Sequence, residues 1–350
     1  MMASNREISF HQRERGCRRD VSRRQPFSLV LTGLLALCVA CGGGESSPNG
    51  ELEAYRAQRG DLSQLATADA VPRGRYVAER VRLESSTGLV VTGTVYHPNP
   101  DSRCLAAVLL QDGRGENSGV IGRLPADFGN VVVLSLDYPT ELPYAIRLPE
   151  VMRHTAKLQR AARRIPAIFS LGAAYLERRE DVDSKRIAVA ATSFAVPFAT
   201  IAAAMDTRFR NVALIYGAGD MPLVLAANLP DVPAPLRSAA ARLAMQPFSA
   251  FAPERFIGRI APRPLVMING VDDPQMPVAA VRHLYDAARP PKSLLWLRTG
   301  HLMPTDSALI RLLIDSAFAR LPVLRDSLST ASCPGRVTAP APLSSTRAPP

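Results

Sequence analysis

Ser193, Asp273 and His301 each follow an apolar run of the kind that forms a buried strand. A serine hydroxyl is a weak nucleophile at neutral pH unless a neighbouring base accepts its proton. An imidazole can accept that proton, and a carboxylate can fix the imidazole in the required tautomer. These three residue types therefore indicate acyl transfer through an activated serine, provided that the fold brings them together.

The residues around Ser193 have the pattern of a strand that turns sharply into a helix. An apolar run at 187–191 precedes the serine, and a helical pattern follows it from Phe194. Ala191 and Ala195, two residues before and two after, are small, as they must be where the strand and helix backbones pass close to each other. The alternative is that Ser193 only caps the helix.

Asp273 and His301 lie just past the ends of two later apolar runs. Asp273 could equally be a turn residue before a helix, a role that Asp272 could also fill. His301 is the histidine that follows a strand pattern in the last third of the chain, whereas the other four lie in the N-terminal segment, at the end of an early hairpin or in predicted helices.

Strand and helix patterns alternate from about Glu79 to Leu321. Strands are predicted at 81–83, 89–96, 106–110, 131–136, 187–191, 212–216, 265–268 and 294–297. Helices are predicted at 145–176, 194–205, 236–245, 278–288 and 307–321. This alternation predicts an α/β fold with a mostly parallel central sheet covered by helices on both faces. In such sheets the reactive groups gather at the carboxyl ends of the strands, where all three residues would lie.

The order and setting of these residues resemble the α/β-hydrolase superfamily over residues 79–322, especially its serine esterase and dienelactone-hydrolase-like branches. The most specific part is the segment Pro262–Asp273, followed by Gly-His at 300–301. The resemblance implies Ser193 as nucleophile, His301 as general base and then acid, and Asp273 as the residue that orients the imidazole. It implies no cofactor and no metal. The chain departs from the family's Gly-x-Ser-x-Gly pattern by having alanine at both glycine positions.

An oxyanion hole is expected from two backbone N–H groups, one directly after the nucleophile and one in the loop after an early strand. The first would be that of Phe194. The second would be that of Arg114, with Gly113 as the next choice. Where the family usually has His-Gly, this chain has Asp112-Gly113. A glycine-rich turn that binds nothing is the alternative.

Residues 217–259 are longer than a simple crossover and predict a small helical cap insertion. Met221, Leu223 and Leu225 could line an acyl or alcohol pocket, or they could merely pack on the sheet.

The N-terminus resembles the signal of a bacterial lipoprotein. Seven arginines precede the apolar run Phe27–Ala40, which has the length of a signal-peptide core, and Cys41 follows. Cys38 replaces the leucine usual three residues before the lipidated cysteine. We predict a signal peptide at 1–40, lipidation of Cys41 and a flexible tether and N-terminal extension at 41–78. An ordinary cleaved signal and an uncleaved short anchor are the alternatives.

Such an anchor predicts a partner membrane and an exported protein that faces the periplasm or the cell surface, with the outer membrane as the expected destination. Residues 323–350 predict a disordered Pro-rich tail.

The composition is that of a globular protein, with 350 residues, 47% hydrophobic residues and a net charge of +11. The arginines are scattered without interleaved aromatics, which argues against nucleic-acid binding. Cysteine and histidine spacings predict no metal site, and Cys104 and Cys333 suggest no disulfide framework.

The sequence favours a serine hydrolase that cleaves a small-molecule carboxylic ester through an acyl-enzyme. A thioesterase or a peptidase would use the same three residues. The competing hypothesis from another class is a non-catalytic surface lipoprotein that uses a hydrolase fold as a binding scaffold, since fold alone does not fix function. Nothing in the sequence indicates the oligomeric state.

Overall fold

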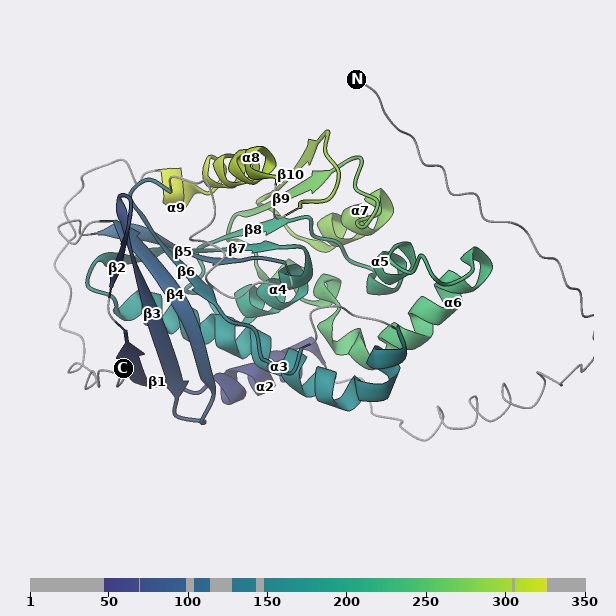
Figure 1. The fold of residues 1–350 in the computed structure, drawn as a ribbon, viewed down its shortest axis with the longest axis horizontal. Helices are drawn as coiled ribbons and strands as arrows, with labels where there is room; N and C mark the ends of the chain where they lie inside the picture. The colour runs from purple at the N-terminus through teal and green to yellow at the C-terminus, as the bar shows by residue number, and fades with distance from the viewer. Residues whose placement is uncertain are drawn as a thin grey trace, which may run out of the picture. The chain divides into compact units, whose positions relative to one another are not determined.

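The computed structural model describes residues 47–68, 70–98, 104–113, 128–142, 148–303 and 306–325. By its internal contacts the chain divides after Ser46, and the part from Ser47 onward is a compact unit with its own core. The centre of this unit is a ten-stranded mixed sheet, and its strands lie in the order β1-β3-β4-β6-β5-β7-β8-β9-β10, with β2 paired to β3 (Figure 1).

The strands form an antiparallel part and a parallel part. The antiparallel part contains β1 (Leu62–Thr67), β2 (Val71–Arg73), β3 (Tyr76–Ser85) and β4 (Val90–Pro98). The parallel part contains β5 (Leu105–Gln111), β6 (Val131–Leu136), β7 (Val182–Thr192), β8 (Asn211–Ile215), β9 (Leu265–Gly270) and β10 (Lys292–Leu297). β4 joins the two parts by pairing antiparallel to β6.

Helices cover both faces of the sheet. The helices are α2 (Pro48–Arg59), α3 (Leu148–Arg178), α4 (Val196–Met205), α5 (Met221–Ala227), α6 (Ala234–Met245), α7 (Val278–Ala287), α8 (Ser307–Phe318) and α9 (Pro322–Arg325). Short 3-10 turns are η2 (Ser193–Ala195), η3 (Gln246–Phe251), η4 (Pro253–Arg255) and η5 (Ile257–Arg259). None of the helices in the described ranges has the length and hydrophobicity needed to cross a bilayer.

Two hydrophobic cores explain why the central strands are apolar without alternation. One core packs α2, α3, α4 and α7 against one face of the sheet, and the other packs α8 and α9 against the opposite face. Every residue of β5, β6, β8 and β9 is therefore buried. In Figure 1, α8 and α9 lie above the sheet, and α2, α3 and α4 lie below it.

The segment 41–78, predicted as a flexible tether and N-terminal extension, is part of the fold from Ser47 onward. Leu52 and Tyr55 of α2 are buried in the first core, and β1 pairs antiparallel with β3 at the edge of the sheet. Arg56 donates to the carbonyl of Met205, which fixes α2 against the end of α4. No helix was predicted at α2 because the helix buries only a few side chains and its sequence is mostly polar.

The described elements can be compared with the predicted insertion and the predicted C-terminal tail. The helical insertion predicted at 217–259 is present as α5, α6 and the turns η3 to η5. α9 extends to Arg325, three residues into the segment 323–350 that was predicted as a tail. The predicted signal peptide, Cys41 and residues 326–350 lie outside the described residues.

Cys104 corrects one expectation about the cysteines. It lies just before β5 and is disulfide-bonded, whereas the sequence suggested no disulfide framework. The other four cysteines of the chain all lie outside the described residues.

Candidate active site

Ser193 lies in a sharp turn between β7 and α4. Its φ of +51° is in the left-handed region, which is strained for a residue with a side chain. Ser193 opens the short turn η2, and α4 follows directly, with Ala195 rather than Ser193 as its N-cap residue. Ala191 and Ala195 have no exposed surface, so both methyl groups fill the space beneath the turn. The local geometry is that of a nucleophile elbow.

Ser193, His301 and Asp273 form a continuous hydrogen-bonded row. Ser193 Oγ lies 3.2 Å from His301 Nε2, and His301 Nδ1 lies 2.7 Å from Asp273 Oδ2. Because a carboxylate only accepts, this contact assigns the proton to Nδ1 and leaves the lone pair of Nε2 facing the serine hydroxyl. The three residues predicted from the sequence are therefore brought together, from three strand ends.

The Asp273 carboxylate is held by its own turn. Its Oδ1 accepts hydrogen bonds from the backbone N–H groups of Gln275 at 2.8 Å and Met276 at 3.2 Å. The side chain has no exposed surface, whereas Asp272 is exposed. The structure thus distinguishes the two neighbouring aspartates and leaves Asp273 with one fixed oxygen for the imidazole.

Two residues that the sequence analysis missed hold the His301 loop. Tyr216 follows β8 with a φ of +51°, and its hydroxyl lies 3.0 Å from Thr299 Oγ1. Its ring centroid lies 5.1 Å from that of His301. Burial raises the pKa of Tyr216, so the hydroxyl stays protonated. Because this contact depends on how three strand ends are aligned, the sequence contained no direct signal for it.

Gly270 allows the same loop to pass close to the end of β9. A Cβ atom at this position would lie 2.3 Å from the carbonyl oxygen of Thr299. That carbonyl accepts a hydrogen bond from Asp272 N at 3.2 Å. Glycine is therefore required at position 270 by the close approach of two backbones.

The loop after β5 lies against Ser193, as expected for the second part of an oxyanion hole. A Cβ atom on Gly113 would lie 3.5 Å from Ser193 Cβ. The hydroxyl of Tyr138 donates to the carbonyl of Asp112 at 2.7 Å and so holds this loop in place. Phe194 directly follows Ser193 in η2. Arg114, our first choice for the second donor, lies outside the described residues.

Aromatic side chains continue from the elbow into the first core. Tyr138, Phe194, Phe198 and Phe251 make successive edge-to-face contacts with centroid distances of 5.8, 5.3 and 5.9 Å. Because Phe198 and Phe251 are buried, the row fixes the elbow against this core.

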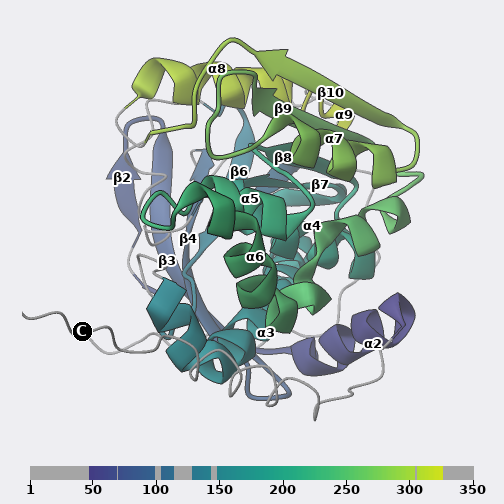
Figure 2. The same ribbon diagram turned by 90° about the vertical axis from the view of Figure 1, so that its right-hand side faces the viewer.

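The three apolar residues that we singled out in the predicted insertion lie on α5. Met221 packs partly buried against the core, Leu223 is exposed, and Leu225 is half-buried. The end of α5 is tied to the Asp273 turn, because Asn228 Nδ2 donates to the carbonyl of Gln275 at 2.9 Å. α5 and α6 lie in front of the sheet in Figure 2.

Solved structures of esterases share this architecture. Acetyl xylan esterase from Paenibacillus sp. R4 matches with a TM-score of 0.57 and 16% identity, over 76% of this chain and 93% of that one. Acetyl xylan esterase 1 from Thermoanaerobacterium sp. JW/SL YS485 matches with a TM-score of 0.57 and 16% identity, over 81% and 92%. The chain has the α/β-hydrolase fold. A putative acetyl xylan esterase from Bacteroides fragilis NCTC 9343 is a further α/β-hydrolase neighbour, with a TM-score of 0.51 and 16% identity, over 73% and 77%.

No family model matches the sequence, and no curated protein matches it. The α/β-hydrolase assignment therefore depends on the fold, and the dienelactone-hydrolase-like branch stays a prediction. Within the described ranges, no cluster of three or more His, Cys, Asp or Glu side chains could hold a metal ion.

Proposed function

We propose that this α/β-hydrolase cleaves carboxylic esters, with Ser193 as nucleophile, His301 as general base and acid, and Asp273 as the residue that orients the imidazole. The observation that carries the proposal is the continuous row from Asp273 through His301 to Ser193 Oγ. The names of the esterases that share the fold support an ester as substrate.

The proposed reaction has two steps. Ser193 Oγ attacks the ester carbonyl carbon while its proton passes to His301 Nε2. The tetrahedral intermediate then expels the alcohol, which takes that proton and leaves the acyl group on Ser193. In the second step His301 accepts a proton from water, the hydroxide attacks the acyl-enzyme, and the carboxylic acid leaves as Ser193 Oγ is reprotonated.

The oxyanion formed in each step needs hydrogen-bond donors. We assign this role to the backbone N–H of Phe194 together with that of Arg114 or Gly113. The Cβ position of Gly113, 3.5 Å from Ser193 Cβ, supports this choice of loop. One such donor is worth about 3 kcal/mol in the transition state.

The decisive experiment uses the purified chain with p-nitrophenyl acetate and a fluorophosphonate probe. The wild type is expected to release p-nitrophenol and to be labelled on the peptide that contains Ser193. Ser193→Ala should lose both signals, whereas Ser249→Ala, at an exposed serine in η3, should keep them. Hydrolysis that persists in Ser193→Ala would refute the assignment.

We further propose that the chain is exported and anchored through lipid on Cys41. The arginine-rich N-terminal segment, the apolar run Phe27–Ala40 and Cys41 directly after it support this proposal. Labelled palmitate should be incorporated into the wild type and not into Cys41→Ala. Equal incorporation into both would exclude this cysteine as the lipidated residue.

A further inference from the structure

One side of the domain carries an excess of cations without carboxylate partners. We call this surface the basic face and define it by seven residues: Arg153, Lys157, Arg160, Arg163, Arg242, Arg259 and Arg289. All seven are exposed, and none forms an ion pair with a carboxylate of the described residues. Between Val151 and Arg164 the sequence contains no acidic residue.

The elements of the basic face are contiguous. The Gln159 side chain of α3 donates to the carbonyl of Pro247 in η3, and Arg163 lies over the ring of Phe251 in the same turn. Arg259, just beyond, donates to Asn49 of α2 at 2.9 Å. In Figure 2, α2, α3 and α6 all lie on the side that faces the viewer.

Large apolar side chains are exposed among these cations. Leu236 and Leu243 are 58% and 49% exposed and lie seven residues apart, on one side of α6. Met152 at the start of α3 is 52% exposed. A helix that combines exposed leucines with cations and has no acidic residue is typical of segments that lie on a membrane surface.

A hollow lined by three arginines and one glutamate lies next to the point where the described chain begins. Its volume is about 410 Å³, and it is lined by Glu254, Arg255, Gly258, Arg259, Ala287 and Arg289. Arg255 is paired with Glu51, whereas Arg259 and Arg289 have no carboxylate partner among the described residues. A Cβ atom added at Gly258 would lie 3.2 Å from the carbonyl oxygen of Ala287 and 3.7 Å from Arg289 Nε, so a side chain here would enter the hollow. The hollow is suited to an anionic headgroup.

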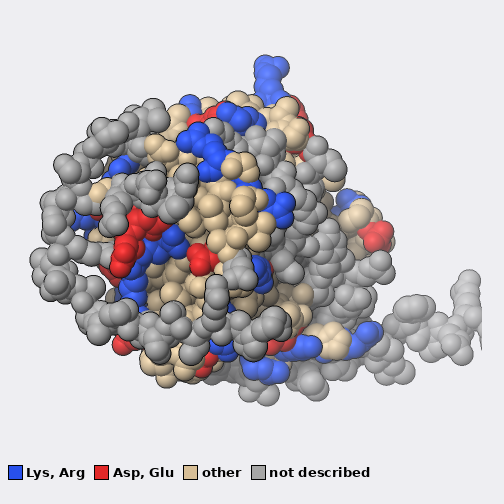
Figure 3. Space-filling model, turned by 60° about the vertical axis from the view of Figure 1, so that its left-hand side comes forward, with Lys and Arg blue, Asp and Glu red and all other residues tan. Residues whose placement is uncertain are grey.

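The start of the described chain at α2 lies beside Arg259 and supports a membrane as the partner. Arg259 contacts Asn49, and an extended chain of the six residues from Cys41 to Ser46 spans only about 20 Å. A lipid on Cys41 would therefore keep this side of the domain close to the bilayer. Other sides differ, since the surface seen in Figure 3 carries Asp and Glu side chains among its Lys and Arg.

We infer that the basic face is a docking surface for a bilayer that contains anionic phospholipids. The cations would lie at the headgroups, and Leu236 and Leu243 would enter the interface. This inference rests on the lipid-anchored location proposed above, but it can be tested without the anchor. Exposed leucines favour a bilayer over nucleic acid as the polyanion, because nucleic-acid backbones are bound mainly through charge.

The experiment uses residues 47–350, which form a compact unit with both cores inside it. Sedimentation is measured with vesicles of phosphatidylcholine alone and with vesicles of phosphatidylcholine and phosphatidylglycerol in equal amounts. Binding is expected only to the mixed vesicles and should decrease with added salt. A triple variant, Arg153→Gln, Lys157→Gln and Arg160→Gln, should bind at least about tenfold more weakly.

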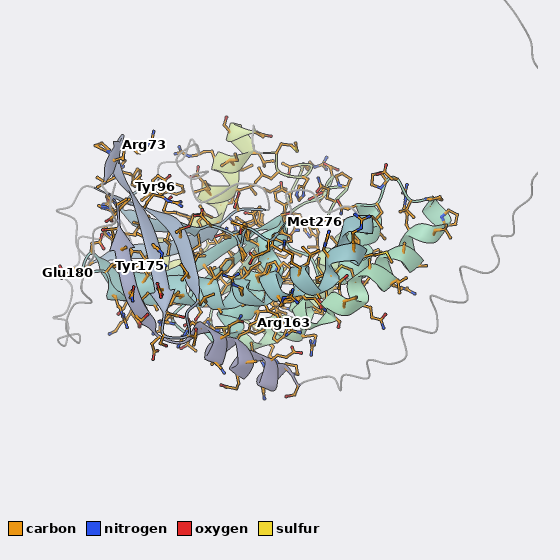
Figure 4. All side chains as sticks on the ribbon, turned by 60° about the horizontal axis from the view of Figure 1, so that its bottom comes forward. Arg73, Tyr96, Arg163, Tyr175, Glu180 and Met276 are labelled. Atoms are coloured by element: carbon orange, nitrogen blue, oxygen red, sulfur yellow. The ribbon has the colours of Figure 1, made fainter. Side chains whose placement is uncertain are left out.

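The matched control removes the same charge elsewhere. Arg311→Gln and Arg320→Gln change exposed residues at and after α8 on the opposite face of the sheet, and Arg73→Gln changes β2. Arg73 and the basic-face residue Arg163 lie well apart in Figure 4. This control variant should bind mixed vesicles like the wild type. Leu236→Ser with Leu243→Ser should weaken binding while the thermal unfolding temperature is kept.

The inference would be overturned if the wild type did not bind mixed vesicles, or if the triple and control variants lost vesicle binding equally. It would also be overturned if the protein bound duplex DNA but not vesicles. Vesicle binding is independent of palmitate incorporation at Cys41 and of ester hydrolysis. A failure of either earlier proposal is therefore distinguishable from a failure of this one.

Discussion

The ring of Tyr216 packs against the imidazole of His301, with a centroid distance of 5.1 Å and an angle of 57° between the rings. The Tyr216 hydroxyl also bonds to Thr299, two residues before the histidine. Tyr216 therefore holds both the ring of His301 and the loop that carries it.

Tyr216→Phe should lower kcat for p-nitrophenyl acetate with little change in KM. It removes the bond to Thr299 but keeps the ring, so the loop gains freedom while the substrate contacts stay the same. A loss of about 1 kcal/mol in stability is expected from one buried hydrogen bond. Tyr175→Phe is the control, since the hydroxyl of Tyr175 on α3 is distant in sequence from the site and accepts from Arg179, which directly follows α3. The Tyr175→Phe variant should lose similar stability at unchanged kcat, and an equal fall of kcat in both variants would argue against a positioning role.

Asp273→Asn should reduce kcat by about 10³ to 10⁴ without unfolding the protein. The amide has the same shape, but its NH₂ group can face the imidazole and favour the wrong tautomer. Stopped-flow release of p-nitrophenol measures the acylation rate, and circular dichroism verifies the fold. Asp272→Asn changes the exposed neighbour and should leave kcat unchanged. Activity close to that of the wild type in Asp273→Asn would show that the carboxylate does not orient His301.

Gly270→Ala should displace the His301 loop. The new methyl carbon would meet the carbonyl of Thr299 at 2.3 Å, a distance that backbone atoms can relieve only by moving. We expect a large loss of kcat and weaker labelling by the fluorophosphonate probe. Gly300→Ala lies in the same loop, and its nearest contact would be an ordinary 3.9 Å. If both variants behave alike, the close approach at Gly270 is not what positions the histidine.

The pH dependence of stability should reveal the buried carboxylate of Asp206. Burial alone would raise its pKa, but hydrogen bonds and charge from Arg208, with a hydrogen bond from Ser170, outweigh burial and lower it. Because the pKa of Asp206 is lower in the folded state, its carboxylate stabilises the fold at pH values above the unfolded pKa of about 3.9. This contribution is lost as the pH falls from there through the folded-state pKa.

Asp206→Asn should therefore unfold more easily at neutral pH, by about 3 kcal/mol, because Arg208 is left without its buried partner. Below about pH 4 the difference from the wild type should shrink. Urea unfolding at several pH values measures both effects. A difference that stays constant from neutral to acid pH would show that Asp206 does not carry the effect.

Most of the parallel sheet could be predicted because its strands are buried on both faces and appear as uninterrupted apolar runs. The three candidate active-site residues were found for the same reason, since each follows such a run. α2 and β1 were missed because only one side of each is buried, and their patterns are weak. Tyr216 was missed for another reason: its role depends on contacts between strand ends that are more than 80 residues apart.

The paired alanines beneath Ser193 have a consequence for recognising related chains. The methyl groups of Ala191 and Ala195 are accommodated at the two positions where the family usually has glycine, so the sharp turn does not depend on glycine. A search that demands glycine on both sides of the serine would pass over any protein built this way. A backbone criterion, namely a serine with positive φ between a buried strand and a short helical turn, would retrieve it.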